Sequence, residues 1–116
     1  MIIRKEHFGR HEGRDVNLYT METDHMRVQI IELAALVRAV YVKGTDGIER
    51  NVVLGMSTLE GYEKQTYFLG AVIGRHANRI AGGEVILNGV KYGLEKNDGD
   101  NNLHSGKDGF HNRVFT

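Results

Sequence analysis

The chain has 116 residues, of which 41% are hydrophobic and 26% charged, and its 15 basic and 15 acidic side chains give a formal net charge of +0. This composition predicts one small globular domain and excludes extensive disorder, a membrane-spanning helix and a general electrostatic attraction to nucleic acid. The chain has no cysteine and no secretory signal at its N-terminus, so we expect a cytoplasmic protein without disulfides.

Chain reversals in this sequence depend on glycine. The chain has 15 glycines and 0 prolines, whereas average proteins contain about 7% and about 5% of these residues. Turns built from glycine, asparagine and aspartate are typical of β-hairpins. The sequence therefore predicts an all-β protein.

The first half of the chain alternates between apolar and polar residues. The alternation predicts strands over residues 16–21 and 26–31, the second with Met26, Val28 and Ile30 on one face. A third strand is expected over residues 36–42, and the turn residues 43–47 end it.

Three further segments up to residue 64 carry weaker patterns. Residues 32–40 also fit a helical stripe, but their β-like flanks favour a strand. Residues 52–54 are a candidate for a short buried strand, and residues 58–64 for one or two helical turns. Gly61 weakens the prediction of a helix.

The clearest local pattern lies in the second half of the chain. Asn88 and Gly89 separate two β-prone runs, and this pair is typical of a two-residue hairpin, whose turn positions both need a positive φ. The polar, glycine-rich residues 97–109 predict a long loop, and loops of this length are often functional. The chain closes with an apolar, β-prone tail over residues 113–116.

Two segments carry candidate binding residues. Residues 75–79 combine two arginines, a histidine and an asparagine between apolar residues and glycines. Asn78 and Arg79 together offer an acceptor and several fixed donors, which suit recognition of hydroxyl groups. The alternative is a structural arginine that pairs with a carboxylate or with loop carbonyls. In the long loop, His104 is either a ligand-binding residue or an exposed loop histidine.

The remaining histidines do not predict a metal site. His7 and His11 have the i,i+4 spacing of two ligands on a helix face, but Gly9 lies between them. No third ligand is near, and the glutamate of a zinc-protease motif is absent. We therefore expect no metal and no other cofactor.

Taken together, these segments resemble the aldose 1-epimerase family. Residues 74–80, Gly-Arg-His-Ala-Asn-Arg-Ile, are similar to its glycine–arginine–x–alanine–asparagine–arginine–isoleucine signature. Residues 97–110 resemble its asparagine-rich loop, which ends in leucine–histidine–glycine–glycine and then glycine–phenylalanine. The early strand at residues 51–55, Tyr62 and the hairpin at residues 85–94 occur in matching order.

The resemblance implies an antiparallel β-sandwich of the galactose mutarotase-like type. Residues 1–116 correspond to the N-terminal third of this single domain and leave it incomplete at the C-terminus. Because a lone third of a sandwich leaves unpaired sheet edges, we expect the chain to associate with itself or with the remaining C-terminal portion.

The implied reaction interconverts the α and β anomers of free hexoses such as galactose and glucose. A general acid and a general base open and close the sugar ring without any cofactor. By resemblance, Asn78 and Arg79 bind sugar hydroxyls, and His104 contacts the sugar near its ring oxygen. The acid, a second histidine, and the base, a glutamate, fall beyond these residues in the family, so the isolated chain is expected to be inactive.

The chain departs from the family pattern at three places. Ser105 replaces the first glycine after the histidine, Ala34 stands at a usual glycine, and Lys43-Gly44 replaces a common proline–aspartate pair. Two other functions remain open: a non-catalytic carbohydrate-binding or regulatory β module, and a relative that acts on hexose phosphates, for which Arg75 is an additional cation.

Overall fold

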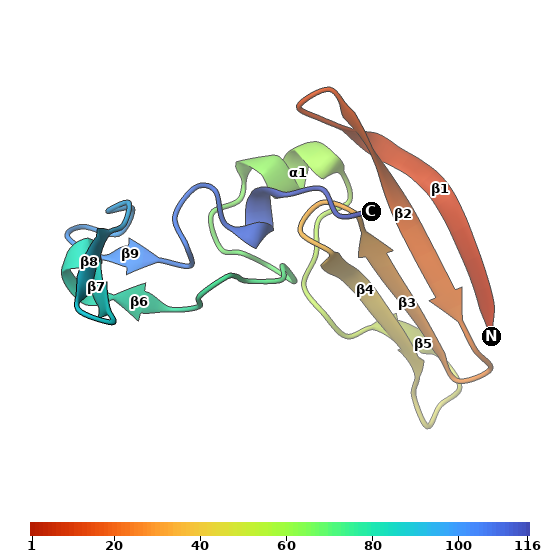
Figure 1. The fold of residues 1–116 in the computed structure, drawn as a ribbon. Coiled ribbons are helices and arrows are strands. Elements are labelled where there is room, and N and C mark those ends of the chain that lie inside the picture. Colours follow the sequence, from red (N-terminus) through yellow and green to blue (C-terminus); the bar gives the residue numbers. More distant parts are fainter. The chain divides into compact units, whose positions relative to one another are not determined.

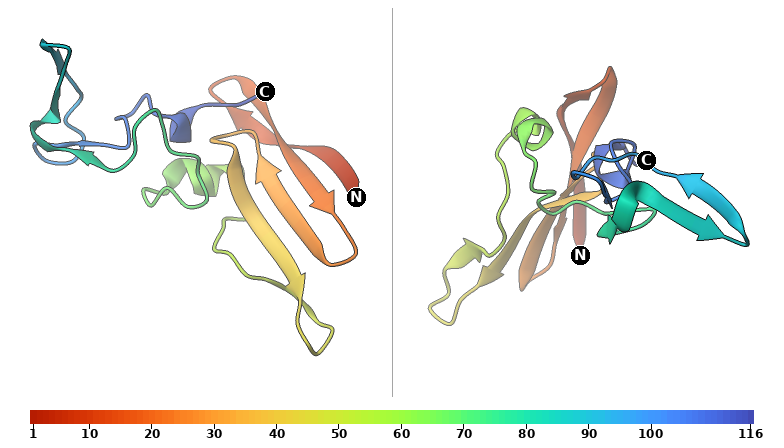
Figure 2. Two further views of the ribbon diagram at one scale, coloured as in Figure 1. Left: turned by 60° about the horizontal axis from the view of Figure 1, so that its bottom comes forward. Right: turned by 90° about the vertical axis from the view of Figure 1, so that its left-hand side faces the viewer.

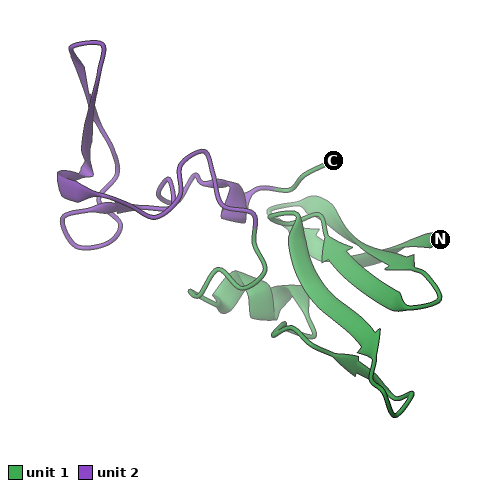
Figure 3. Ribbon diagram, turned by 90° about the horizontal axis from the view of Figure 1, so that it is seen from below, with its two compact units in different colours: residues 1–71, 114–116 green, residues 72–113 purple.

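The computed structural model describes all residues 1–116 as two compact units (Figure 1 and Figure 3). Unit 1 comprises residues 1–71 and 114–116, and unit 2 comprises residues 72–113. Strands make up nearly all of the regular structure and pair antiparallel throughout, which confirms the predicted all-β class. None of the helices has the length and apolar character needed to span a membrane.

Unit 1 is a five-stranded antiparallel meander in which each strand pairs with the next one in sequence (Figure 2). The strands are β1 (Ile2–His11), β2 (Arg14–Glu22), β3 (Met26–Ile31), β4 (Leu36–Lys43) and β5 (Glu49–Asn51). The three predicted strands of this region correspond to β2, β3 and β4. Strand β1 was not predicted, because it is an edge strand with mostly exposed side chains and thus lacks an apolar alternation.

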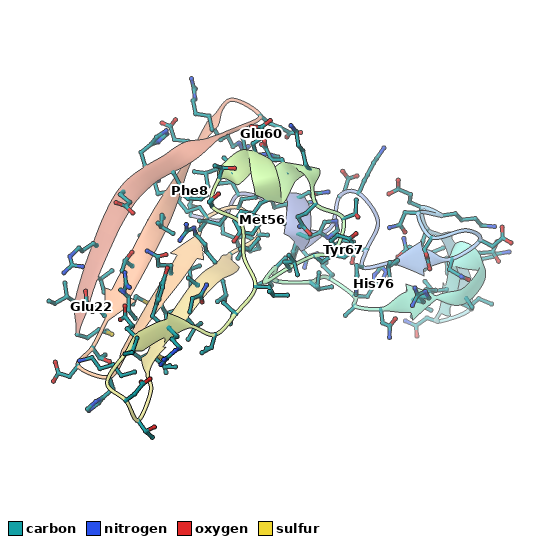
Figure 4. All side chains as sticks on the ribbon, turned by 180° about the vertical axis from the view of Figure 1, so that it is seen from behind. Phe8, Glu22, Met56, Glu60, Tyr67 and His76 are labelled. Carbon is teal, nitrogen blue, oxygen red and sulfur yellow. The ribbon has the colours of Figure 1, made fainter.

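The buried core of unit 1 lies on one face of this sheet. Alternate residues of β2 point into it, and they meet β3 and the helix α1 (Leu59–Lys64), which packs against β1. The core residues are Val16, Leu18, Ile31, Leu33, Ala34, Leu36, Leu59 and Tyr62, with Phe8 and Met56 packed against them (Figure 4). The predicted face of Met26, Val28 and Ile30 is the opposite one and is only partly buried.

The segment between β3 and β4 is a turn, and the ambiguous residues 32–40 become a strand only from Leu36 onward. A continuous helix is ruled out because Ala34 and Ala35 have φ values of 60° and 43°. Ala34 is fully buried with this left-handed backbone. This conformation explains why glycine is the usual residue at that position in the family.

The predicted buried strand at residues 52–54 is wrong. Pairing with β4 ends at Asn51, and Val52 and Leu54 are 58% and 79% exposed. The Asn51 side-chain oxygen accepts hydrogen bonds from the backbone N–H groups of Val40 and Val53. This side chain takes the place of a strand partner, so the ladder stops there.

Helix α1 confirms the expected helical turns at residues 58–64. The Thr58 hydroxyl caps the helix by accepting a hydrogen bond from the Gly61 N–H at 3.2 Å. Replacing Thr58 by alanine should lower the free energy of unfolding of unit 1 by about 1 kcal/mol, because an N–H at the helix start loses its acceptor. Urea denaturation followed by circular dichroism measures this change. Thr58→Ser should retain the stability, and equal losses in both variants would contradict the capping role.

A partly buried carboxylate joins β2 to the turn after β3. Glu32 Oε2 accepts hydrogen bonds from the Asn17 backbone and side chain at 2.9 and 2.8 Å, and Oε1 accepts one from the Tyr19 hydroxyl at 2.9 Å. Burial opposes ionisation of this group, but the hydrogen bonds and the charge of Lys5 outweigh burial and lower the Glu32 pKa below 4.5.

This lowered pKa predicts a pH dependence of stability. A carboxyl whose pKa is lower in the folded state stabilises the fold above its unfolded pKa, and this contribution is lost as the pH falls through the folded pKa. Urea unfolding should therefore show a stability that falls below about pH 4.5. In Glu32→Gln the decline over this range should be shallower, and an unchanged pH profile would refute the assignment.

Unit 2 contains two small two-stranded sheets. Strands β7 (Glu84–Leu87) and β8 (Val90–Gly93) form the predicted hairpin, whose turn residues Asn88 and Gly89 have φ values of 51° and 78°. Strand β6 (Arg79–Ile80) pairs with β9 (Asn102–Leu103), and short 3₁₀ turns follow at Ala81–Gly83 and Phe110–Asn112. The predicted long loop at residues 97–109 is interrupted by the two-residue strand β9.

Candidate functional site

The two segments with candidate binding residues lie side by side in unit 2. The Asn78 backbone N–H donates to His104 Nδ1 at 2.9 Å, and the His104 N–H donates to the Asn78 carbonyl at 3.1 Å. The next rung is the β6–β9 pair of Arg79 and Leu103. The structure therefore brings Asn78, Arg79 and His104, which are predicted to bind together, to one place in the fold.

The hydrogen bond from Asn78 fixes the tautomer of His104. A backbone N–H can only donate, so Nδ1 must accept and carries no proton. The neutral ring then bears its hydrogen on Nε2, which makes Nε2 the donor of this side chain. A neutral donor of this kind suits a hydrogen bond to an uncharged oxygen such as a sugar ether or hydroxyl.

Asn78 and His104 both have left-handed backbones, with φ values of 62° and 54°. Asparagine tolerates this conformation better than most residues, because its short polar side chain interacts with the nearby backbone. Such conformations outside glycine cost about 1–3 kcal/mol and cluster at functional sites. The Asn78 residue is exposed, so its amide is accessible to a ligand.

Arg79 forms the ion pair that the structural alternative requires. Its Nε donates to Asp98 Oδ2 at 2.6 Å, and the Arg79 side chain remains 57% exposed. Because the pair uses Nε, the terminal nitrogens of the guanidinium remain as oriented donors. The ion pair and a ligand-binding role are therefore compatible.

Hydrogen bonds between His76 and the loop around β9 hold the segments that carry Asn78, Arg79 and His104. His76 Nε2 and Asn102 Oδ1 are 2.5 Å apart, and the Asn102 amide donates to the Glu95 carbonyl at 2.7 Å. Asn102 is only 2% exposed. Ser105 accepts a hydrogen bond from the His76 N–H at 3.0 Å and donates one to the His76 carbonyl at 2.9 Å.

Ser105 has a φ of 70°, the region that favours the glycine usual in the family. The departure therefore adds a hydroxyl that joins the segment of His76 to the loop of His104, while the backbone keeps a conformation typical of glycine. A side chain at this position can form hydrogen bonds that glycine cannot.

Asn97 fixes the other side of the loop. Its side-chain oxygen accepts from the Leu103 N–H at 2.7 Å, and its amide donates to the Leu103 carbonyl at 2.9 Å. Asn97 thus pairs with β9 as a strand residue would. This bracing holds the backbone next to His104 in place.

Sequence reasoning missed three supporting residues, Asp98, Asn102 and His111. His111 interacts with His104, and burial followed by this interaction lowers the His111 pKa below 6.5. Only contacts across the loop identify these residues, although the density of asparagines was visible in the sequence.

His7 and His11 lie on strand β1, and His11 Nδ1 is 2.8 Å from Glu63 Oε1. No group of three or more potential metal ligands forms in the structure.

The chain is similar in sequence and structure to known proteins. The chain is 45% identical over 102 residues to bovine (Bos taurus) galactose mutarotase, covering 87% of this chain and 30% of that protein. It is 35% identical over 103 residues to the aldose 1-epimerase of Escherichia coli, covering 88% and 30%. A crystal structure of galactose 1-epimerase from Lactobacillus acidophilus superposes with a TM-score of 0.83 at 30% identity and covers 97% of this chain and 32% of that one.

The fold and its structural relative define the class as an antiparallel β-protein of the galactose mutarotase-like type. The family model for aldose 1-epimerase matches residues 17–116, and the chain belongs to this family. The chain spans about 30% of the length of the curated relatives it matches.

Proposed function

We propose that this chain carries the sugar-binding residues of an aldose 1-epimerase, which interconverts the α and β anomers of free hexoses such as galactose and glucose. The observation that supports this proposal is the mutual hydrogen bonding of Asn78 and His104 beside the oriented guanidinium of Arg79. The names of the relatives supply the reaction and galactose as the first candidate substrate.

Each residue has a distinct part in this proposal. Arg79, held through Nε by Asp98, donates to sugar hydroxyls from its terminal nitrogens. Asn78 provides an amide donor and an amide acceptor, which match the dual character of a hydroxyl. His104 donates from Nε2 to the ring oxygen and polarises the bond that opens.

Ring opening also needs a general acid at the ring oxygen and a general base at the C1 hydroxyl. In unit 2, Asp98 is engaged with Arg79, and Nδ1 of His104 already accepts a backbone hydrogen bond. These residues therefore bind and polarise the sugar, and the acid and base come from the remaining length of a family member.

A chimera tests the enzymatic proposal. Residues 17–116 would replace the matching part of bovine galactose mutarotase, and the rate of α-galactose mutarotation would be followed by polarimetry. We expect clear acceleration over buffer, because the transplanted residues supply the sugar contacts. A folded chimera that binds galactose without catalysing mutarotation would contradict the proposal.

The second candidate is a non-catalytic carbohydrate-binding module, which would use the same hydrogen-bonding groups of Asn78, Arg79 and His104. The chimera distinguishes the two proposals. Both proposals expect the chain to bind galactose without catalysis, but only the enzymatic proposal expects an active chimera.

Two wider properties belong to the same proposal. The absence of cysteine supports a cytoplasmic location. The names of the relatives support a role in hexose metabolism. The partly exposed apolar face of β3, which carries Met26, Val28 and Ile30, supports self-association of the chain. Sedimentation velocity should then show a mass that rises with concentration, and a strict monomer would contradict self-association.

A further inference from the structure

A polar pocket lies close to the candidate sugar-binding residues in unit 2. It has a volume of about 210 Å³ and is lined by Arg75, His76, Ser105, Asp108, Phe110 and Arg113, together with Gly74. His76 precedes Asn78 by two residues, and Ser105 directly follows His104. The candidate sugar-binding residues and this pocket are therefore built from the same two segments, and His76 belongs to the segment that carries Asn78 and Arg79.

The two arginines of the pocket are positioned without being neutralised. The Arg75 guanidinium lies 5.8 Å from the centroid of the Phe110 ring, and no carboxylate pairs with it. Arg113 donates through Nε to the Asp108 backbone carbonyl at 3.1 Å, so its terminal nitrogens remain available. Arginines elsewhere in the chain that pair with carboxylates include Arg4, Arg10, Arg27, Arg50 and Arg79.

The charge balance of the pocket favours an anion. Two guanidinium groups and one carboxylate, that of Asp108, line it, and Asp108 pairs with neither arginine. Guanidinium forks match the geometry of phosphate oxygens, and the stack on Phe110 limits the motion of one of them. The Ser105 hydroxyl adds a small polar group to the same wall.

We infer that this pocket is a subsite for a phosphate monoester or inorganic phosphate, held by Arg75 and Arg113 next to the sugar-binding residues. The position of the subsite relative to a sugar rests on the proposed function, whereas the anion binding itself does not. The ligand phosphate is either the phosphoryl group of a hexose phosphate or a free anion that binds beside a neutral sugar.

The test uses the 116-residue chain and titrates inorganic phosphate at low ionic strength, with ³¹P and ¹H–¹⁵N NMR as readouts. Phosphate should bind and shift the amide signals of His76 and Ser105. Arg75→Gln and Arg113→Gln should each weaken binding about tenfold or more, because each removes a charged donor. Arg50→Gln, which removes an exposed arginine of unit 1, is the matched control and should leave the affinity unchanged.

Asp108→Asn should change the phosphate affinity in the opposite direction to the two arginine variants. Removing the only carboxylate of the pocket should tighten phosphate binding, and a loss of folding cannot produce such a gain. The inference is overturned if wild-type chain does not bind phosphate, or if both arginine variants bind as the wild type does. Unchanged or weaker binding in a folded Asp108→Asn would overturn it too.

Two further arms identify the source of the phosphate. Tighter binding of galactose 6-phosphate than of inorganic phosphate, with the gain lost in His104→Ala, supports a phosphoryl group on the sugar. Equal affinities that His104→Ala does not change support a free anion. Arg75-dependent phosphate binding without any galactose binding would remove the proposed function and keep the anion subsite.

Discussion

Replacing Arg79 by alanine in the galactose mutarotase chimera is expected to lower kcat/KM about 10–150-fold, equivalent to the 1.5–3 kcal/mol that a hydrogen bond from a charged donor contributes. The loss has a direct physical cause. Alanine removes donors that Asp98 holds in orientation at 2.6 Å. Polarimetry over a range of galactose concentrations separates the effect on KM from the effect on kcat.

The conservative variant Arg79→Lys should fall between wild type and alanine. Lysine keeps the positive charge but has a single nitrogen. The arginine guanidinium pairs with Asp98 through one nitrogen and keeps its other nitrogens for a ligand. Arg50→Ala removes an arginine that is paired with Asp46 in unit 1 and serves as the control. A kcat/KM in Arg79→Ala equal to that of the control would leave Arg79 with only the structural role.

Replacing Asn102 by alanine should destabilise the loop that carries His104 by about 2–4 kcal/mol. Asn102 is 2% exposed and bridges His76 to the Glu95 carbonyl. Its removal leaves the His76 ring nitrogen and the Glu95 carbonyl without this partner, and because both bonds are part-buried each loss costs about 1–2 kcal/mol. The expected effect is therefore much larger than that of an exposed asparagine.

Hydrogen exchange measures this second effect, because it reports on unit 2 separately from unit 1. The amides of Leu103 and His104 should exchange much faster in Asn102→Ala, while those of β2 and β3 should keep their protection. Asn112→Ala, which loses only an exposed bond to the Lys107 carbonyl, is the control. Equal exchange in the two variants would show that Asn102 does not hold the loop.

The sequence predicted the elements whose cause is local. The β7–β8 hairpin follows from Asn88 and Gly89, and the alternation of β2 follows from one buried and one partly exposed face. Strand β1 could not be found in this way, because an exposed edge strand has no need for an apolar pattern. The false strand at residues 52–54 had apolar residues, but the Asn51 side chain occupies the Val40 N–H with which a continued strand would pair.

The residues of the candidate site also fall into those that the sequence predicted and those that only the structure reveals. Asn78, Arg79 and His104 were predicted from their residue types and from a resemblance, and their shared location in unit 2 is visible in the structure. Asp98 and Asn102 act across gaps of 19 and 26 residues, to Arg79 and His76 respectively. Such contacts depend on how the loop folds back, which a single sequence does not specify.

The Arg79–Asp98 pair has a consequence for a ligand that carries no charge. The pair is formed at the surface, where dissolved ions screen charges over a Debye length of about 8 Å at physiological ionic strength. Added salt therefore weakens the ion pair that orients the Arg79 guanidinium. Salt does not screen galactose itself, because galactose carries no charge. If Arg79 binds the sugar as proposed, the affinity for this neutral ligand becomes sensitive to ionic strength through the Arg79–Asp98 pair.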